Sequence, residues 1–358
     1  MVHKQCKSCL LVITAVFAVL RLYGAPPEEV KKVYHKEYAA VPATLVSIEN
    51  RYGDVNLINW KKDSVVIDVV VTIDYPPKFK GKELIEYITV DFSVSGNTIK
   101  AVTNIDEHFI DKWYRHDDKK KFRIDYTIHA PAFINLKVLN KYGDVFINEL
   151  SGHAELEIRY GYVRINRLLR GNRKPLNSLY LAYSKGNIEE AGWLMLQMKY
   201  SRLEISRGTA LAGETKYSKL NIDKISSVVL ESKYDTYRFG TLNNLVLSAS
   251  YGSVKAEEIR KKISLETRYT GVEIGHVPAG FSSIDIHNAY GSVKVSIDEK
   301  ASYYLEGNTS YCKLNYPSAR INRIVRNNSA EVSGYVGDDH NAKATVTVKS
   351  KYGSVSLY

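Results

Sequence analysis

A phrase built around a tyrosine recurs along this chain and limits what the chain can fold into. From the second anchor onward, successive tyrosines are 18, 23, 17, 17, 17, 17, 18, 21, 21 and 41 residues apart. Most of these intervals lie close to 17 or 18 residues, so one structural unit repeats at that period, and the last interval corresponds to about two units. The anchors are Tyr52, Tyr142, Tyr160, Tyr183, Tyr200, Tyr217, Tyr234, Tyr251, Tyr269, Tyr290, Tyr311 and Tyr352.

Apolar residues alternate with other residues on both sides of each anchor. Leu, Ile or Val usually stands four and six residues before the tyrosine, and again three and five residues after it, as in Leu203 and Ile205. A period of two predicts two short strands per unit, each with one buried face. The tyrosine has the parity of the buried set, so the pattern predicts an internal aromatic ladder. The alternative is an exposed ladder whose rings stack on sugars.

The corners favour stacked coils over an antiparallel meander. Two-residue hairpins need Gly, Asn or Asp at positive φ, whereas these corners include Ser201–Arg202, Ser218–Lys219 and Cys312–Lys313. Coils that rise ~4.8 Å each would form a rod of roughly 55 Å from Tyr142 onward. The predicted fold is all-β: a single-chain β-solenoid of coils of 17 or 18 residues, with an irregular β-rich N-terminal cap that contains one short helix.

The chain divides into three predicted segments. Residues 1–25 have the order of a secretory signal, with Lys4 and Lys7 before an apolar run that ends at Leu20. Residues 26–130 form the cap, with one repeat-like unit, a helix at 82–88 and a polar loop at 108–121. Residues 131–358 form the solenoid, with an irregular segment at 317–341. The final coil, 344–358, is expected at the end of the stack, either open or covered by that segment.

Sequence motifs for chemistry are absent. The chain has no H-E-x-x-H, G-x-S-x-G, Walker or dinucleotide motif. Cys6 and Cys9 fall in the signal segment, so Cys312 alone remains and no internal disulfide can form. The clusters 116–118 and 338–340 contain Asp and His, but such runs in polar loops are ordinarily solvated turns. We therefore predict no catalytic residue, metal site or cofactor.

Basic residues usually stand directly before the anchors, on the face that alternation places outside. Stacking would align them in a ridge able to bind an anion, for which Lys199, Lys216, Lys233 and Arg268 are the candidates. The alternative is a solvated charge lattice, because glutamates such as Glu214 often stand two residues earlier. The formal net charge of +11 favours an anionic surface or polysaccharide as partner. The sequence has no basic cluster with interleaved exposed aromatic residues, so nucleic acid is not an expected partner.

Several motifs, in their order, carry a family resemblance. They are Asn50–Leu57 (NRYGDVNL), Trp60, Lys82–Ile88 (KELIEYI), Val90–Asn97, Tyr126–Pro131, Lys141–Val145 and Ser232–Asp235. Together they resemble the putative-adhesin β-solenoid proteins of Gram-negative bacteria, over residues 33 to 358. The resemblance implies an exported, repeat-built solenoid, usually without an assigned activity. It brings no functional residues with it.

The sequence thus predicts an exported, non-enzymatic β-solenoid, either an adhesin or a binding or structural protein of the cell envelope. One alternative is a polysaccharide lyase or hydrolase built on a β-helix. Another is a scaffold that self-associates or binds a protein. The expected partners are a polysaccharide or another envelope protein, and no transmembrane segment is expected in the mature chain. The expected location is the periplasm, the outer membrane or the cell exterior.

Overall fold

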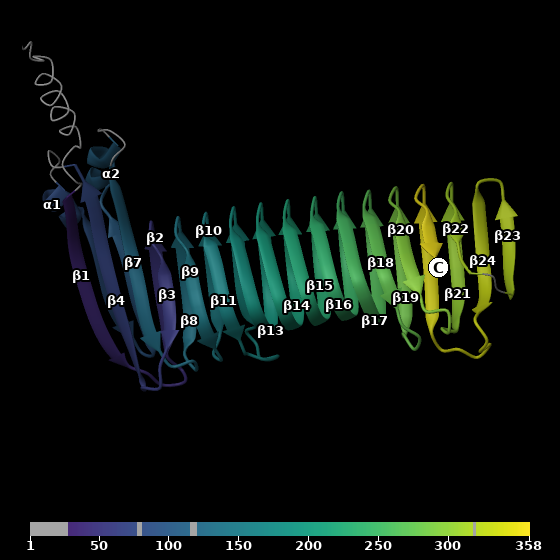
Figure 1. The fold of residues 1–358 in the computed structure, drawn as a ribbon, viewed down its shortest axis with the longest axis horizontal. Coiled ribbons are helices and arrows are strands. Elements are labelled where there is room, and N and C mark those ends of the chain that lie inside the picture. Colours follow the sequence, from purple (N-terminus) through teal and green to yellow (C-terminus); the bar gives the residue numbers. More distant parts are fainter. Residues whose placement is uncertain (1–27, 77–80, 115–119, 318–319) are drawn as a thin grey trace, which may run out of the picture.

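The protein is a long rod of stacked strands with two short helices at its N-terminal end (Figure 1). The computed structural model describes residues 28–76, 81–114, 120–317 and 320–358. The predicted signal segment 1–25 and the cluster 116–118 lie outside the described residues. Within them, no helix has the length and apolar character needed to cross a membrane.

Each coil contributes a strand to two facing sheets, which we name by their position relative to the anchor. The pre-tyrosine sheet contains β2 (Leu45–Arg51), β8 (Asn135–Lys141), β10 (Ala154–Arg159), β12 (Asn177–Ala182), β19 (Ser283–Ala289), β21 (Tyr303–Ser310) and β25 (Thr345–Lys351). The post-tyrosine sheet contains β3 (Val55–Asn59), β9 (Val145–Leu150), β11 (Tyr162–Leu168), β18 (Gly271–Val277), β20 (Val293–Ile297), β22 (Leu314–Asn315) and β26 (Val355–Leu357).

Five long strands in the middle of the rod belong to both sheets. Each begins in the post-tyrosine sheet, bends at the far edge and ends in the pre-tyrosine sheet one residue before the next tyrosine. They are β13 (Lys185–Lys199), β14 (Arg202–Lys216), β15 (Lys219–Lys233), β16 (Thr236–Ser250) and β17 (Ser253–Arg268). Their pairing is parallel, coil on coil, which confirms a solenoid rather than a meander.

The core lies between the two sheets and continues along the rod. In one coil, Leu196 and Met198 of the pre-tyrosine sheet and Leu203 and Ile205 of the post-tyrosine sheet are all buried. Full burial of one such side chain contributes about 1.5–3 kcal/mol, and each coil repeats the set. The two-residue alternation of the sequence therefore gives the core correctly on both sides of the corner.

The tyrosine itself lies outside this core, so the predicted internal ladder is wrong. All twelve anchors have left-handed φ values of 50–63°, and eleven have exposed side chains. A left-handed residue interrupts the pleat, so the tyrosine points outward and the following residue points inward. Its N–H still donates to the next coil, as Tyr200 N does to the Lys216 carbonyl oxygen at 3.1 Å. The prediction counted the two-residue alternation straight through the corner, so it missed this shift of one residue and assigned the tyrosine to the buried face.

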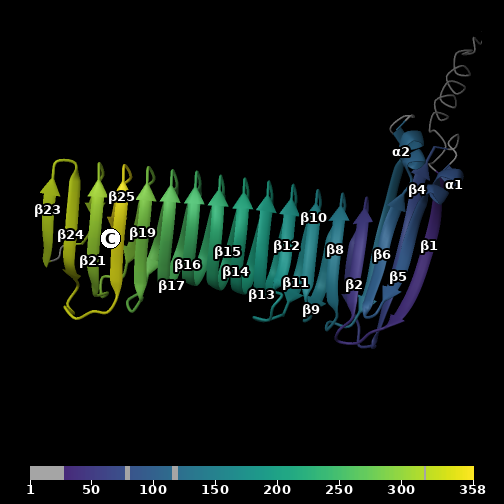
Figure 2. The same cartoon turned by 180° about the vertical axis from the view of Figure 1, so that it is seen from behind.

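The N-terminal cap extends both sheets. An antiparallel set of β1 (Glu28–Ala39), β4 (Ser64–Tyr75) and β7 (Lys121–Ala130) joins β3, while a hairpin of β5 (Ile88–Ser95) and β6 (Thr98–Ile105) joins β2. Figure 2 shows this hairpin beside β2 from behind. The short helix α1 (Gly81–Leu84) and the 3₁₀ turn Ile85–Tyr87 occupy the predicted helical stretch.

A second helix, α2 (Glu107–Tyr114), replaces the first half of the predicted polar loop. Phe109 and Trp113 lie four residues apart, on one face of the helix, and both are buried. Their rings are 5.1 Å apart, and Phe109 also meets the ring of Phe122 at 4.9 Å. The helix thus covers the end of the core with two aromatic residues that its polar neighbours obscure in the sequence.

The last coil is inserted into the stack rather than added at its end. Strand β25 pairs in parallel with both β19 and β21, so the order of coils in space departs from the order in the chain. Beyond β21, the antiparallel hairpin of β24 (Ser329–Val336) and β23 (Arg320–Arg326) ends the rod. The terminus consequently lies between coils in Figure 1. The long final interval between Tyr311 and Tyr352 contains the hairpin of β23 and β24.

Candidate functional site: the tyrosine edge

The twelve tyrosines form one uninterrupted stack along an edge of the rod. Neighbouring ring centroids are 4.8–5.1 Å apart and the ring planes differ by 1–21°. The stack runs from Tyr52 to Tyr290 in chain order, then through Tyr352 to Tyr311, because the last coil is inserted. The spacing equals the rise of the coils, so the backbone sets it.

Ring faces in this stack are covered by neighbouring rings. Eleven of the tyrosines are 40–56 % exposed, and this exposure must come from ring edges and hydroxyl groups. Sugars stack on ring faces, so the internal rungs cannot offer the sugar-stacking platform considered from the sequence. The edge instead presents a line of phenol groups that can form hydrogen bonds.

Inside each corner, the residue after the tyrosine bonds one coil to the next. Ser184 N donates to Ser201 Oγ at 3.1 Å, and Ser201 N donates to Ser218 Oγ at 3.2 Å. Ser218 N then donates to Asp235 Oδ1 at 2.7 Å. These small polar side chains are buried and satisfy the backbone at the turn. The corner is therefore fixed from within, which holds the tyrosine row in position.

Asp235 is a buried carboxylate within this inner row. Its Oδ2 accepts hydrogen bonds from Thr215 Oγ1 at 2.6 Å and Ser232 Oγ at 2.9 Å. The Tyr237 hydroxyl lies 2.5 Å from the same threonine oxygen. Burial, followed by the nearby Asp235 carboxylate, raises the pKa of Tyr237 well above its usual range. This network has the character of a structural brace, since its members are buried away from the surface.

The predicted basic residues lie on the outer surface beside the ladder. Lys199, Lys216 and Lys233 occupy equivalent positions on consecutive strands, and Arg268 follows one coil after Ser250. All four are exposed. Lys233 Nζ is 5.6 Å from the Tyr234 ring centroid and the Arg268 guanidinium is 5.5 Å from that of Tyr269. We call these four residues the first basic row.

The first basic row forms no close ion pair with the glutamates two residues earlier. In the described part of the chain, no ion pair joins any of its four members to a carboxylate. Nearer the N-terminal end such a pair does form, between Arg159 and Glu157 at 2.7 Å. The middle of the edge thus carries cations and glutamates on one face without ion pairs between them in the described residues.

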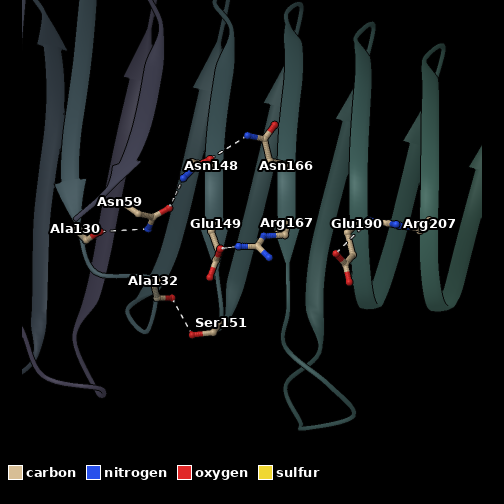
Figure 3. Close-up of polar contacts among 10 residues, drawn as sticks. All are labelled: Asn59, Ala130, Ala132, Asn148, Glu149, Ser151, Asn166, Arg167, Glu190 and Arg207. Atoms are coloured by element: carbon tan, nitrogen blue, oxygen red, sulfur yellow. Dashed lines mark hydrogen bonds and ion pairs between the residues drawn. The ribbon is translucent and has the colours of Figure 1, made fainter. Parts of the chain in front are cut away.

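A different column shows how this rod neutralises stacked charges. On the post-tyrosine sheet, Glu149, Arg167, Glu190 and Arg207 alternate in sign through successive coils (Figure 3). Arg167 pairs with Glu149, and Arg207 lies 3.8 Å from Glu190. Beside them, an amide ladder links neighbouring coils, with Asn166 donating to Asn148 at 3.0 Å. Opposite charges in register stabilise strand pairing, whereas like charges oppose it.

Sequence reasoning missed a second set of cations on the other side of the ladder. Lys185, Arg202 and Lys219 follow their tyrosines by two residues and pair in register on β13, β14 and β15. All three are exposed. We call them the second basic row. The repeat alignment contains this signal, but it becomes meaningful only once the tyrosine between the two rows is known to point outward.

A hollow of about 560 Å³ lies on the pre-tyrosine sheet, beside the first basic row and farther from the tyrosines. Its floor includes the exposed apolar side chains of Met195, Val229 and Val246, and Glu214 and Glu231 line it as well. The acidic groups repel a polyanion, and the apolar groups offer it neither charge nor hydrogen bonds. This hollow and the basic edge therefore suit different ligands.

The Asp and His residues of the remaining predicted cluster form a turn. Asp339 Oδ1 accepts a hydrogen bond from Asn341 N at 2.8 Å, and Asp339 N donates to Ser302 Oγ at 3.1 Å. Across the ranges that the structure describes, no three His, Cys, Asp or Glu side chains are grouped so as to hold a metal ion. Asp54 and Asp144 likewise bond across corners, with Asp54 Oδ1 accepting from Asp144 N at 2.8 Å.

No family model and no curated protein matches the sequence. Eleven solved chains match the structure. A putative adhesin from Parabacteroides distasonis is 9 % identical, with 91 % of this chain and 97 % of that chain covered and a TM-score of 0.34. A putative adhesin from Bacteroides fragilis is 12 % identical, with the same coverage and a TM-score of 0.30.

A protein described as a putative lipid binding protein, also from Parabacteroides distasonis, is 11 % identical over 91 % of this chain and 96 % of that chain, with a TM-score of 0.30. The solved structures to which this chain is similar thus include proteins of the adhesin type that its motifs resemble.

Proposed function

We propose that this protein is an exported, non-enzymatic binding protein of the cell envelope whose tyrosine edge binds acidic polysaccharide. The observation that supports this most is the first basic row: three lysines, stacked in register on consecutive strands, with no carboxylate paired to them in the described structure. The row follows a straight edge, so a linear ligand can contact every rung.

Stacked like charges oppose strand pairing, and a bound polyanion would relieve this repulsion. Like charges directly opposite each other on paired strands cost a fraction of a kcal/mol to about 1 kcal/mol per pair. The alternating column of Glu149, Arg167, Glu190 and Arg207 avoids this cost in the same rod. A polyanion lying along the edge would remove the repulsion, so its binding energy includes that relief.

A hydrolase or lyase on the same rod has less support. Such enzymes need grouped carboxylates, or a basic residue beside a bound cation, on one surface. The free carboxylates beside the edge, Glu214 and Glu231, lie two residues before Lys216 and Lys233 rather than across a cleft. The geometry suits retention of a glycan better than its cleavage.

The test is binding of polygalacturonate and of dextran, an uncharged polysaccharide, to residues 26–358. Both components are followed by size-exclusion chromatography with light scattering. We expect co-elution with intact polygalacturonate and none with dextran. The variant Lys199→Glu, Lys216→Glu and Lys233→Glu should lose the complex.

The matched control reverses Lys224, Lys261 and Lys262, which are exposed near the edge opposite the tyrosines. Both triple variants change the net charge equally, so the control should still bind. Equal loss in the two variants would reduce the effect to overall charge. Shortened polygalacturonate would show an enzyme and refute the proposal.

A further inference from the structure

We infer that the binding site straddles the ladder: the first and second basic rows flank the tyrosines, and the site takes a linear uronic-acid polysaccharide whose carboxylates point to both sides of its chain. This inference rests on the proposed function and adds residues and a ligand class to it. The segment concerned runs from Tyr183 to Tyr234.

The corner geometry places one cation on each side of a tyrosine. In the corner of Lys199, Tyr200, Ser201 and Arg202, strand β13 ends at Lys199 and strand β14 begins at Arg202. Ser201 is buried, while the lysine, the tyrosine and the arginine are exposed. The same arrangement recurs one coil later with Lys216, Tyr217 and Lys219. A chain lying on the tyrosine edges therefore has cations on its left and its right.

The two-sided arrangement is confined to the middle of the rod. Before Lys185 the second row continues as Tyr162, and after Lys219 it continues as Thr236 and Ser253. Cations stand on both sides of the rungs Tyr200 and Tyr217, whose rings are 4.8 Å apart. The rungs on either side have one cation each, because Ala182 lies opposite Lys185 at Tyr183 and Thr236 lies opposite Lys233 at Tyr234. The site thus has two two-sided rungs with one further cation beyond each, unlike a diffuse basic surface.

The balance of charge within this segment stays positive. Six cations form the two rows between Lys185 and Lys233. The exposed carboxylates nearest to the ladder lie one outward position farther away, Glu214 and Glu231 on one sheet and Glu204 on the other, and one buried carboxylate, Asp235, lies inside the corner after Tyr234. Glu204 pairs with Arg202 at 2.9 Å. Lys185 and Lys219 have no ion pair in the parts of the chain that the structure describes.

The row between the cations selects the class of polyanion. It consists of phenol groups, which donate and accept hydrogen bonds but carry no charge at neutral pH. A polysaccharide offers hydroxyl groups that donate and accept hydrogen bonds, and ring oxygens that accept them, whereas a polyphosphate offers only charged acceptor oxygens. In an extended uronic-acid polymer with a twofold repeat, successive carboxylates point to opposite sides, which matches cations on both sides of a neutral hydrogen-bonding row.

The experiment measures the affinity of the full mature chain for polygalacturonate, its oligomers of increasing length, and polyphosphate of matched charge. The second-row variant Lys185→Glu, Arg202→Glu and Lys219→Glu should bind polygalacturonate at least about tenfold more weakly. Its control, Arg238→Glu, Lys255→Glu and Lys294→Glu, changes two lysines and one arginine on the same sheet and should stay within about twofold. Circular dichroism and monomeric elution check that every variant is folded.

A second variant tests the hydroxyl row without removing the stack. Tyr200→Phe, Tyr217→Phe and Tyr234→Phe together should weaken polygalacturonate binding severalfold and polyphosphate binding less, because phosphate oxygens accept hydrogen bonds but donate none. Oligomer affinity should rise with length and level off once the oligomer spans the two-sided segment.

Three outcomes would overturn the inference. If reversal of the second row leaves binding intact while reversal of the first row abolishes it, the site is one-sided and the proposed function still stands. If polyphosphate binds as tightly as polygalacturonate, or the phenylalanine variant loses both equally, the ligand class is wrong. If the unaltered chain binds no polyanion, the proposed function fails together with this inference.

Discussion

Each tyrosine corner balances a backbone cost against ring stacking. A left-handed conformation costs a non-glycine residue about 1–2 kcal/mol, and an aromatic pair contributes about 0.5–1.5 kcal/mol beyond the area it buries. An internal rung such as Tyr251 has two such pairs, with Tyr234 and Tyr269. Stacking is therefore large enough to explain why a bulky residue occupies a position that ordinarily suits glycine.

Substitution of Tyr251 separates the two contributions. Tyr251→Ala loses both ring contacts and keeps the backbone cost, so we expect it to lower the free energy of unfolding by about 1–3 kcal/mol. Tyr251→Gly loses the same contacts but relieves the backbone, and should be less destabilising than alanine by about 1 kcal/mol. Tyr251→Phe keeps the stack and should be nearly neutral. Urea denaturation ranks them, and alanine matching glycine would contradict the strain argument.

Two buried tyrosines differ in what their hydroxyl groups contact. The Tyr237 hydroxyl bonds to Thr215, so Tyr237→Phe should cost about 1 kcal/mol. The Tyr303 hydroxyl is buried and has no hydrogen-bond partner within the described ranges, so Tyr303→Phe should be neutral or stabilising by up to about 1 kcal/mol. Thermal melting compares the pair, and a destabilised Tyr303→Phe variant would indicate a partner such as an ordered water.

The same buried phenols make the protein sensitive to alkali. Burial raises the pKa of Tyr126 and Tyr237, and raises that of Tyr303 to about 12, from the ordinary value of 10.0. Above pH 10 the unfolded chain loses these protons while the folded chain keeps them, so the free energy of unfolding falls as pH rises. Each group adds a slope of up to about 1.4 kcal/mol per pH unit.

Denaturation between pH 9 and pH 12 measures that slope. Tyr303→Phe should make it shallower across pH 10 to 12, because one of the three groups is removed. The Tyr251→Phe variant is the control, since that side chain is exposed. An unchanged slope in Tyr303→Phe would show that this phenol ionises freely in the folded protein.

At the scale of elements, the inserted coil makes the C-terminal end of the rod, from β21 to β24, depend on β25. Strand β25 is paired on both sides, with β19 and with β21, and within the described ranges the hairpin of β24 and β23 pairs with the rest of the rod only through β21. Loss of β25 should therefore release everything from β21 to β23. A coil placed at the end of the stack would release only itself.

Val348→Asp tests this order. Val348 is buried on β25, and an unpaired buried carboxylate is strongly destabilising. We expect hydrogen exchange to rise in residues 303–336 as well as 345–357, while β13 to β16 remain protected. The exposed neighbour gives the control variant Lys349→Asp, which should leave exchange unchanged. Faster exchange confined to 345–357 would contradict the inserted arrangement.

Across the whole molecule, charge is arranged by face. The post-tyrosine sheet carries an alternating column, whereas the tyrosine edge carries like charges on successive coils. Exposed cations act over about 10 Å at 0.1 M salt and about 3 Å at 1 M salt. We therefore expect the proposed attraction between this edge and a polyanion to be strong mainly at low ionic strength.

We expect the affinity for polygalacturonate to fall at least about tenfold when salt rises from roughly 0.1 M to 1 M, because the screening length then falls from about 10 Å to about 3 Å. The first-row variant should show a much weaker dependence on salt, since its cations are gone. Calorimetry at several salt concentrations measures both. Affinity that is independent of salt would point to the apolar hollow around Met195 and Val229 instead.

The sequence alone determined the repeat, the stacked coils and the core. Residues such as Leu203 and Ile205 alternate with period two over many units, which predicts the buried faces, and the residues at the corners favoured stacked coils over an antiparallel meander. The first basic row also followed from the sequence, because its parity is counted along one strand without crossing a corner. Local patterns were sufficient wherever the backbone stayed regular.

Only the tertiary structure decided what happens where the backbone is irregular. The left-handed tyrosine reverses the face of the side chain, and no pattern in the neighbouring strands records a positive φ at Tyr200. The insertion of β25 depends on pairing between segments far apart in the chain, which spacing cannot order. The two-sided basic segment depends on both, since Lys199 and Arg202 flank the ladder only when the corner turns the ring outward.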